Sequence, residues 1–346
     1  MKISIIAFTD NGMEIANKLL NSIPESNLTL CEDELIDMNL TRCKKGGLSD
    51  WTEEHFSTSD ALIFIGAIGI AIRAIAPLIK SKVKDPAIVV VDELGQFSIP
   101  VLSGHIGGAN ELANEISKIL DAIPVITTAT DINNVFAIDT WAKSQGLRIS
   151  NPQNIKLVSS KLLKGEEIHI KSDYSIKGDM PQNVLLNDLE NDYDYDVLIS
   201  YEDYENDEKS KDTLFLIPSI ITIGIGCRKD KDFETIEKVI LNALNDENCH
   251  LLSLDSIASI DKKANEKGIL ELAKNYNLPY QTYSADELNA LEGDFTKSDF
   301  VKSVVQVDNV CERSAIIQSK GKILRRKDAC DGVTVALAIK DIDLSW

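Results

Sequence analysis

The sequence predicts an α/β protein with an N-terminal, mostly parallel and doubly covered sheet, a small α/β middle section and a separate C-terminal α/β domain. In the N-terminal part, short apolar runs alternate with segments of helical periodicity, a pattern typical of parallel sheets with helices on both faces. After residue 139 the segments become shorter and more polar, and the alternation returns near residue 220. The chain of 346 residues is also longer than one ordinary domain, which has about 100–200 residues, and so predicts more than one domain.

These changes of pattern divide the chain into regions 1–138, 139–214 and 215–346. In the first region we expect strands at residues 2–8, 61–65, 87–92, 97–102 and 123–127, and helices at 11–20, 70–79 and 108–120. In the last region the expected strands are 221–226, 280–283, 322–325 and 333–339, and the expected helices are 233–244, 261–276 and 310–318. A short apolar run near 251–254 lies between the first two helices. The middle region contains segment 188–208, with ten acidic residues, four tyrosines and no Lys or Arg. We interpret it as an acidic exposed face or insertion.

Composition excludes several classes of protein. The net charge of −19 argues against nucleic acid or an anionic membrane as the main partner, because such binding depends on clustered Lys and Arg. No run of 18 apolar residues occurs, and the first residues lead directly into a polar helical pattern. We therefore expect neither a membrane span nor a signal peptide. The six cysteines form no Cys-x-x-Cys pair and no zinc-site spacing, which indicates free thiols in the cytoplasm.

Segment 103–110 reads SGHIGGAN and is the strongest functional signal in the chain. One of only four histidines stands among three glycines, between a predicted strand and a predicted helix. Glycines allow a sharp turn and close approach of a ligand, while the N–H groups of the following helix point back at whatever binds. A plain connector is the alternative interpretation. The histidine favours function, because a tight turn has no use for imidazole whereas a site working near neutral pH does.

Ligands of open parallel sheets bind beyond the carboxyl ends of the strands, so four N-terminal loops are expected to lie together. They are GAIG at 66–69 ahead of Arg73, DELG at 92–95, SGHIGGAN, and TTATD at 127–131. For DELG a plain turn is the stronger interpretation. TTATD offers three hydroxyls and a carboxylate to a polar ligand or to acid–base chemistry. A simple N-cap by Asp131 or Thr130 explains it equally well, and Glu111 likewise suits the dipole of the helix that it begins.

A fifth loop, GIGCRK at 224–229, ends an apolar strand with two glycines, a thiol and two cations. Backbone N–H groups and a guanidinium suit a carboxylate or phosphate. Neighbouring cations lower a thiol pKa, but no paired histidine accompanies Cys227, so a lining role is favoured over a nucleophile. Residues 325–327 form a second basic cluster, for which a solvated surface run is the stronger interpretation. A phosphate-binding P-loop, a Gly-x-Ser-x-Gly elbow and a His-Glu-x-x-His helix are all absent from the sequence.

Taken together, these segments make the chain resemble the cobalt-precorrin 5A hydrolase family of anaerobic cobalamin synthesis. The stretches FIGAIGIAIRAIAPL, VVVDELGQFSIPVLSGHIGGANELA and PVITTATD are similar to the N-terminal module of that family. ITIGIGCRK and the closing VTVALAIK are similar to its C-terminal module. The resemblance spans nearly the whole chain, is most specific at SGHIGGAN and is weakest in the middle region.

The resemblance implies a hydrolase whose substrate is a cobalt-bearing, contracted tetrapyrrole. Its ring A acetate is closed as a δ-lactone onto the extruded C20 unit, and the enzyme opens the lactone and releases C20 with its methyl group as acetaldehyde. No cofactor is required, because the metal arrives with the substrate. His105 is then the base that activates water, or alternatively an axial ligand of the cobalt. The N–H groups of Gly107 and Gly108 and the Asn110 amide are candidates to hold the oxyanion, and Glu111 or Asp131 is the second base.

Cationic and loop residues are expected to bind the acetate and propionate groups of this substrate. The expected binding residues are Gly66, Gly69, Arg73, Ser103, Gly104, Gly107, Gly108, Asn110, Thr127, Thr128, Thr130, Gly226, Cys227, Arg228 and Lys229. Two other functions stay open: a tetrapyrrole- or nucleotide-binding protein without catalysis, and a thiol enzyme centred on Cys227. A homodimer and transient contact with neighbouring pathway enzymes are also open.

Overall fold

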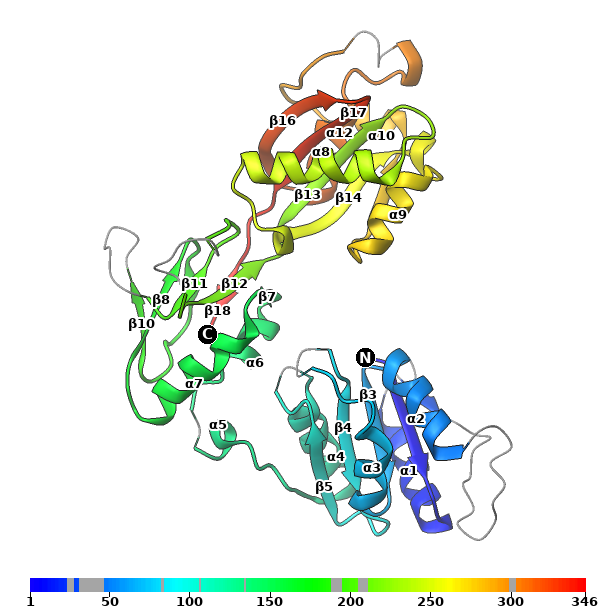
Figure 1. Ribbon diagram of the computed structural model, residues 1–346, viewed down its shortest axis with the longest axis vertical. Helices are drawn as coiled ribbons and strands as arrows, with labels where there is room; N and C mark the ends of the chain where they lie inside the picture. The colour runs from blue at the N-terminus through cyan, green and yellow to red at the C-terminus, as the bar shows by residue number, and fades with distance from the viewer. Residues whose placement is uncertain are drawn as a thin grey trace. The chain divides into compact units, whose positions relative to one another are not determined.

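The computed structural model describes residues 1–23, 28–30, 47–81, 84–105, 107–133, 135–187, 195–204, 211–298 and 303–346, with the backbone alone for 28–30, 130 and 131. The chain forms two compact units, Met1–Thr140 and Trp141–Trp346 (Figure 1). Among the described helices, none is both long and apolar enough to cross a membrane.

Unit 1 is built on a six-stranded sheet of order β2-β1-β3-β4-β5-β6. The strands are β1 (Ile3–Ala7), β2 (Leu28–Leu30), β3 (Ala61–Ile65), β4 (Ala87–Val91), β5 (Phe97–Leu102) and β6 (Ile123–Pro124). Strands β2, β1, β3 and β4 run parallel, β5 pairs with β4 in the antiparallel sense, and β6 is parallel to β5. The prediction of a mostly parallel sheet is confirmed.

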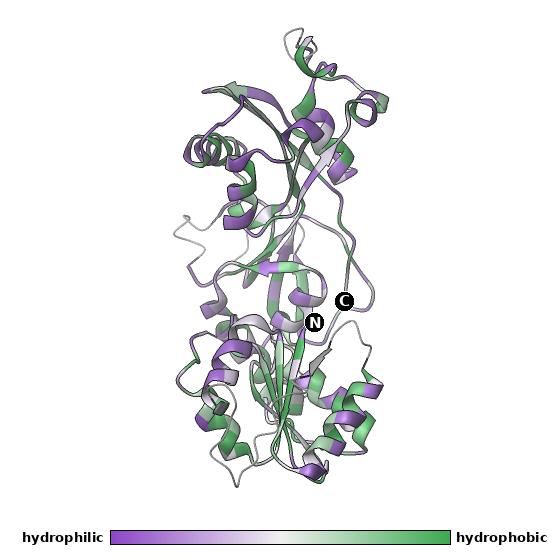
Figure 2. Ribbon diagram, turned by 90° about the vertical axis from the view of Figure 1, so that its right-hand side faces the viewer, coloured by the Kyte–Doolittle hydropathy of each residue, from purple (hydrophilic) through white to green (hydrophobic). Residues whose placement is uncertain are grey.

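Helices cover both faces of this sheet, as the sequence predicted. Helices α1 (Asp10–Ser22) and α4 (Ala109–Leu120) share one core with alternate strand residues, among them Ile5 and Ile63. Helices α2 (Gly47–Thr58) and α3 (Ile68–Ile75) share the opposite core with the intervening residues, such as Phe64. Figure 2 shows the strands between the helices in the hydrophobic colour. Strands with both faces buried lack apolar–polar alternation, which is why they occur in this sequence as continuous apolar runs.

The direction of β5 corrects the expectation that the four N-terminal loops lie together. Ile88 at the start of β4 is paired with Leu102 at the end of β5, so the loop that follows β5 lies at the edge where β4 begins. GAIG and DELG follow β3 and β4 and lie at the opposite edge. A strand of five residues separates the two edges by about 17 Å.

The predicted strand 123–127 is also shorter and more exposed than expected. Strand β6 contains only Ile123 and Pro124, and Ile123 is 61% exposed. It pairs only with β5, at the end of the sheet order, and so has one neighbour where a central strand has two. TTATD therefore follows an edge strand, and its last residues begin the short helix α5 (Ala129–Ile132).

The middle part of unit 2 contains a sheet of order β10-β8-β11-β12-β7. Its elements are β7 (Leu147–Ile149), α7 (Ile155–Leu163), β8 (Ile168–Ser172), β10 (Val184–Asn187), β11 (Val197–Ile199) and β12 (Leu214–Pro218). Helix α6 (Ile138–Ser144) begins in unit 1, which includes Asp139, and ends in unit 2. Strand β11 is central and buried, although it lies inside the acidic segment 188–208. The interpretation of that whole segment as an exposed face or insertion is therefore wrong for residues 197–199, while residues 188–194 and 205–208 lie outside the described residues.

The last residues of the chain return to this middle section. Strand β18 (Leu344–Ser345) pairs with β9 (Ile176–Lys177), and the Trp141 ring stacks on the Trp346 ring with 5.1 Å between centroids. The Trp141 Nε1 donates to the Ser345 carbonyl at 2.8 Å. Residues 344–346 thus pack with region 139–214, although the sequence placed them with region 215–346.

The C-terminal sheet has the order β15-β14-β13-β17-β16. Its strands are β13 (Ile221–Cys227), β14 (Leu254–Ile260), β15 (Tyr280–Tyr283), β16 (Lys322–Cys330) and β17 (Val333–Ile339). The helices are α8 (Phe233–Asp246), α9 (Lys267–Asn275), α10 (Ala285–Ala290) and α12 (Val310–Ser319). Strand β14 was not predicted because buried serines interrupt its apolar pattern. Ser256 and Ser259 are fully buried and bonded to Thr222 Oγ1 and the Ile225 carbonyl of β13.

Helices α8 and α9 pack on one face of this sheet, and α12 contacts β13 very closely. A Cβ added at Gly224 would lie 1.8 Å from the carbonyl oxygen of Cys311, so only glycine fits between strand and helix at this position.

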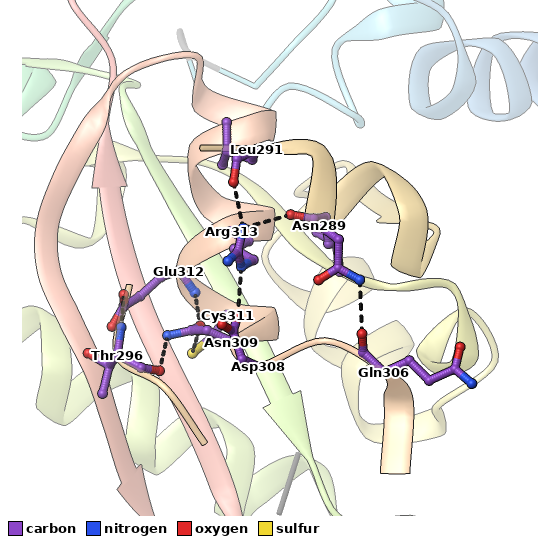
Figure 3. A network of polar contacts seen from close by, with 10 residues as sticks. Asn289, Leu291, Thr296, Gln306, Asp308, Asn309, Cys311, Glu312 and Arg313 are labelled. Atoms are coloured by element: carbon purple, nitrogen blue, oxygen red, sulfur yellow. Dashed lines mark hydrogen bonds and ion pairs between the residues drawn. The ribbon is translucent and has the colours of Figure 1, made fainter. Parts of the chain in front are cut away.

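The start of α12 contains a buried charged network (Figure 3). Glu312 is fully buried and accepts the N–H groups of Lys327 at 2.7 Å and Thr296 at 3.0 Å. Arg313 binds the carbonyls of Leu288 and Leu291, pairs with Asp308 and lies over the Phe295 ring. These bonds attach both α12 and β16 to the chain segment that comes after α10.

The carboxylate of Glu312 should make the stability of this network depend on pH. Burial raises its pKa, but the N–H donors outweigh burial and lower it below the ordinary 4.5. The stabilisation is therefore present above that value and is lost as pH falls through the lowered folded-state pKa. We expect Glu312→Gln to reduce the free energy of unfolding by about 1–3 kcal/mol at neutral pH, with the deficit shrinking on acidification, in urea titrations. The exposed Glu234→Gln is the control, and a deficit of Glu312→Gln that does not vary with pH would contradict this account.

Candidate functional site

The loop after β5 has a tightly specified backbone. Ser103 adopts φ +56°, a left-handed conformation that is uncommon outside glycine, and its hydroxyl donates to the Asp85 carbonyl at 2.9 Å. A Cβ added at Gly107 would lie 2.2 Å from Ser103 Cβ, and one at Gly104 would lie 2.7 Å from Asn110 Oδ1. These two glycines are therefore required by close approach within the loop. Ile106 lies outside the described residues.

The N–H groups that follow the histidine are used inside the loop. Gly108 N–H donates to the His105 carbonyl at 2.9 Å, Ala109 N–H to Ser103 at 3.1 Å and Asn110 N–H to Gly104 at 3.0 Å. Gly108 is the N-cap of α4 with φ +86°. Of the predicted oxyanion donors, the Gly108 N–H is thus already engaged in this conformation, and the Asn110 amide donates to Thr128, which puts more weight on Gly107.

His105 is paired with a carboxylate that the sequence analysis did not identify. Its Nδ1 lies 3.4 Å from Oδ2 of Asp139, and the imidazole is 16% exposed while the carboxylate side chain is 9% exposed. Burial raises the pKa of Asp139, but the hydrogen bond and charge of His105 and the N–H of Thr140 outweigh burial and lower it overall. No local motif marks Asp139, because its partner is 34 positions earlier in the chain.

The other three histidines have structural roles, which singles out His105. His55 is buried, with Nδ1 3.0 Å from Ser4 Oγ and its ring beside Trp51. His169 Nδ1 lies 3.1 Å from Asn187 Oδ1. His250 accepts the Leu252 N–H and so begins a short 3-10 helix.

Among the described residues, a hydrogen bond joins SGHIGGAN to TTATD. The buried Asn110 side chain donates through Nδ2 to Thr128 Oγ1 at 2.9 Å. Thr127, the first residue of TTATD, is exposed. Glu111, which follows SGHIGGAN in the first turn of α4, is also exposed. The side chains of Thr130 and Asp131 lie outside what the structure describes.

Gly66, Gly69 and Arg73 belong to the other edge of the unit 1 sheet. Gly66 follows β3 and donates its N–H to the carbonyl of Val91 at the end of β4. Arg73 is exposed on α3, with Nη1 3.4 Å from the Gly69 carbonyl. The structure does not bring these residues beside His105.

In the C-terminal loop, several backbone N–H groups have partners within the chain itself. Gly226 and Cys227 lie in the ladder with β17, and Arg228 N–H donates to Gly332 at 2.9 Å. Just after the loop, Asp230 N–H bonds the carboxylate of Glu266 at 2.7 Å, and Glu266 also pairs with Lys263. The side chains of Arg228 and Lys229 are exposed, so they are the groups of this loop that can meet a ligand.

The environment of Cys227 disfavours a thiol enzyme. Burial raises the pKa of its thiol above the ordinary 9.0, and the charge of Lys263 offsets only part of that rise. A nucleophilic cysteine requires a lowered pKa.

Two of the three cations at 325–327 have carboxylate partners in the protein. Arg325 is bound by Asp246, Glu247 and Asp328, and Arg326 pairs with Asp294, so these cations already have protein partners. Within the described part of the chain, no three His, Cys, Asp or Glu side chains are arranged to hold a metal ion.

The close contact at Gly107 gives a direct test of the loop geometry. Gly107→Ala would place its Cβ 2.2 Å from Ser103 Cβ, and we expect a loss of about 1–3 kcal/mol in the free energy of unfolding. Gly69→Ala is the matched control, because its Cβ would meet only Arg73 Nη1 at 3.7 Å and alanine favours the helix. Equal stability of Gly107→Ala and the unmodified protein in urea unfolding would show that the loop has a different conformation.

Comparisons with known proteins give the same result along the whole chain. Residues 50–131 match the family model described as Cobalamin synthesis G N-terminal, residues 136–218 match Cobalamin biosynthesis central region, and residues 221–338 match Cobalamin synthesis G C-terminus.

Individual relatives and one solved structure extend the comparison. The chain is 34% identical to a Salmonella typhimurium protein named cobalt-precorrin-5A hydrolase, over 97% of each chain. It is 29% identical to a Priestia megaterium protein of the same name, over 98% of this chain and 95% of that one. A crystal structure of a cobalamin biosynthesis protein G homologue from Sulfolobus solfataricus is 28% identical over 98% of this chain and 97% of that one, with a TM-score of 0.39. The chain therefore belongs to the cobalamin synthesis G family, which its N-terminal, central and C-terminal regions all match.

Proposed function

We propose that this protein is a cobalt-precorrin-5A hydrolase. It opens the ring A acetate δ-lactone of cobalt-precorrin 5A and releases C20 with its methyl group as acetaldehyde, giving cobalt-precorrin 5B. The observation that carries this proposal is 34% identity over 97% of the chain to a relative of that name. The SGHIGGAN loop contains His105, which supplies the base that the reaction needs.

Lactone opening begins with His105. A neutral imidazole nitrogen takes a proton from water while the water oxygen attacks the lactone carbonyl. The oxyanion that forms is held by N–H donors, for which Gly107 and the Asn110 amide are the candidates, at about 3 kcal/mol per donor. Collapse of the intermediate breaks the bond to the ring oxygen, which leaves with a proton as an alcohol, and the acetate is freed as a carboxylate.

Release of acetaldehyde needs a second base. Removal of the alcohol proton lets the C–O bond become a carbonyl while the C–C bond to C20 breaks, and the electron pair passes to the conjugated ring. Glu111 is one candidate for this role, because it is exposed and directly follows Asn110. Asp131 is the other candidate. Axial ligation of the substrate cobalt is the rival role of His105, since imidazole is a good ligand for this class of metal.

Binding of the substrate carboxylates is assigned to exposed cations in an otherwise acidic protein with net charge −19. Arg228 and Lys229 are the leading candidates. Arg73 is a weaker one, because it lies at the opposite edge of the unit 1 sheet from His105. Of the predicted partners, the corrinoid substrate is part of this proposal. The homodimer, the pathway contacts, the absence of a protein-bound cofactor and the cytoplasmic location stay predictions.

The proposal is tested by mixing the purified protein with cobalt-precorrin 5A and measuring acetaldehyde. We expect stoichiometric release by the unmodified protein and a loss of about 100-fold or more with His105→Ala. His169→Ala is the control, because that histidine lies in a strand of the middle section. Binding without acetaldehyde would identify a carrier instead. A shift of the corrinoid absorption spectrum on binding that His105→Ala abolishes would assign His105 to the cobalt.

A charge reversal tests the binding loop. Arg228→Glu should raise the Michaelis constant about tenfold while kcat changes little, because one cation that meets a substrate carboxylate is replaced by an anion. Lys238→Glu introduces the same change on the exposed face of α8 and should leave both constants unaltered. Arg228→Glu with an unaltered Michaelis constant would remove this residue from the substrate site.

A further inference from the structure

We propose that Asp139 is the positioning residue of His105, holding the proton on Nδ1 so that Nε2 presents its lone pair to the reacting water. The chemical part of this inference rests on the proposed function, whereas the pairing itself does not. It deepens the assignment of His105 by naming the group that fixes its tautomer and orientation.

The carboxylate is held on both of its oxygens. Oδ1 accepts the Thr140 N–H at 3.0 Å, and Oδ2 faces His105 Nδ1 at 3.4 Å. Asp139 is 7% exposed and lies in the first turn of α6, next to the fully buried Ile138. A buried carboxylate with one oxygen bound by the backbone has little freedom to turn away from its partner.

The charge state of Asp139 decides which imidazole nitrogen is protonated. Because the pKa of the carboxyl is lowered overall, Asp139 is an anion at neutral pH and can only accept a hydrogen bond. A neutral histidine beside it therefore carries its proton on Nδ1, and Nε2 is left as the basic nitrogen. The same arrangement of a base held by a buried carboxylate recurs in hydrolases that use histidine.

Hydrogen bonds of the loop hold the backbone of His105 in place. The role left for the Asp139 carboxylate is to orient the imidazole ring. The His105 carbonyl accepts from Gly108, and Ser103 is tied to Asp85 on the preceding side. The imidazole is the more exposed member of the pair, 16% against 9%. A more exposed base backed by a more buried acceptor lets a ligand reach the ring while the carboxylate stays shielded.

The pairing is tested by NMR of the full-length protein labelled with ¹⁵N at histidine. Only four histidines contribute signals, and His105→Ala identifies the signal of His105. We expect the Nδ1–H tautomer for neutral His105 in the unmodified protein and its loss in Asp139→Ala. An Nε2–H tautomer in the unmodified protein overturns the proposal, even if Asp139→Ala does not fold. Persistence of the Nδ1–H tautomer in a folded Asp139→Ala protein also overturns it.

Kinetics separate positioning from a purely structural ion pair. Asp139→Ala should lower kcat for acetaldehyde release by about 100-fold while the Michaelis constant stays within about twofold, because the base is misdirected but the substrate still binds. Asp50→Ala is the matched control: its carboxylate also lies in the first turn of a helix, α2, but it is exposed. Unaltered kcat in Asp139→Ala would reject the role. If the unmodified protein releases no acetaldehyde, the proposed function fails, and the NMR result still decides the pairing.

Discussion

The reversed direction of β5 is the constraint on which the arrangement of the N-terminal unit depends. Only five residues, 92–96, connect β4 to β5, and a parallel crossover needs about a dozen or more. Asp92 closes the connection by accepting the N–H groups of Leu94 at 3.1 Å and Phe97 at 2.6 Å. Gly95 supplies the left-handed residue of the turn with φ +67°. The hairpin therefore sends SGHIGGAN to the edge of the sheet where β3 and β4 begin.

This reversal separates two groups of loops that a fully parallel sheet would have brought together. GAIG and DELG stay at the edge where β3 and β4 end, while TTATD joins SGHIGGAN because β6 follows β5 in the parallel sense. The bond from Asn110 to Thr128 fastens that second pair. The residues around His105 therefore come from the segments that precede β4 and follow β6. Arg73 lies at the opposite edge of the sheet from His105.

In the C-terminal part of the chain, carboxylates of the protein accept hydrogen bonds from backbone N–H groups and pair with cationic side chains. Anionic side chains of the protein occupy nearby donors: Glu266 accepts the N–H of Asp230, which follows the GIGCRK loop, and three carboxylates surround Arg325. Glu312 is likewise buried against backbone N–H groups. Buried carboxylates of this kind are tolerated because each oxygen receives a donor. Exposed cations such as Arg228 are thereby distinguished from those already paired.

The sequence by itself determined the strand and helix alternation, the covered sheet of unit 1, the family and the histidine loop, because these depend on local periodicity and on contiguous motifs. It could also have revealed the direction of β5, since the length of the 92–96 connection alone forbids a parallel crossover. Strand β14 and the buried β11 were hidden because serines and flanking acidic residues masked their apolar pattern. Only the tertiary structure could pair His105 with Asp139, or Glu266 with the Asp230 N–H that follows the GIGCRK loop. Both contacts join residues that are far apart in the chain. Packing of the folded chain brings these residues together, and no local sequence pattern indicates it.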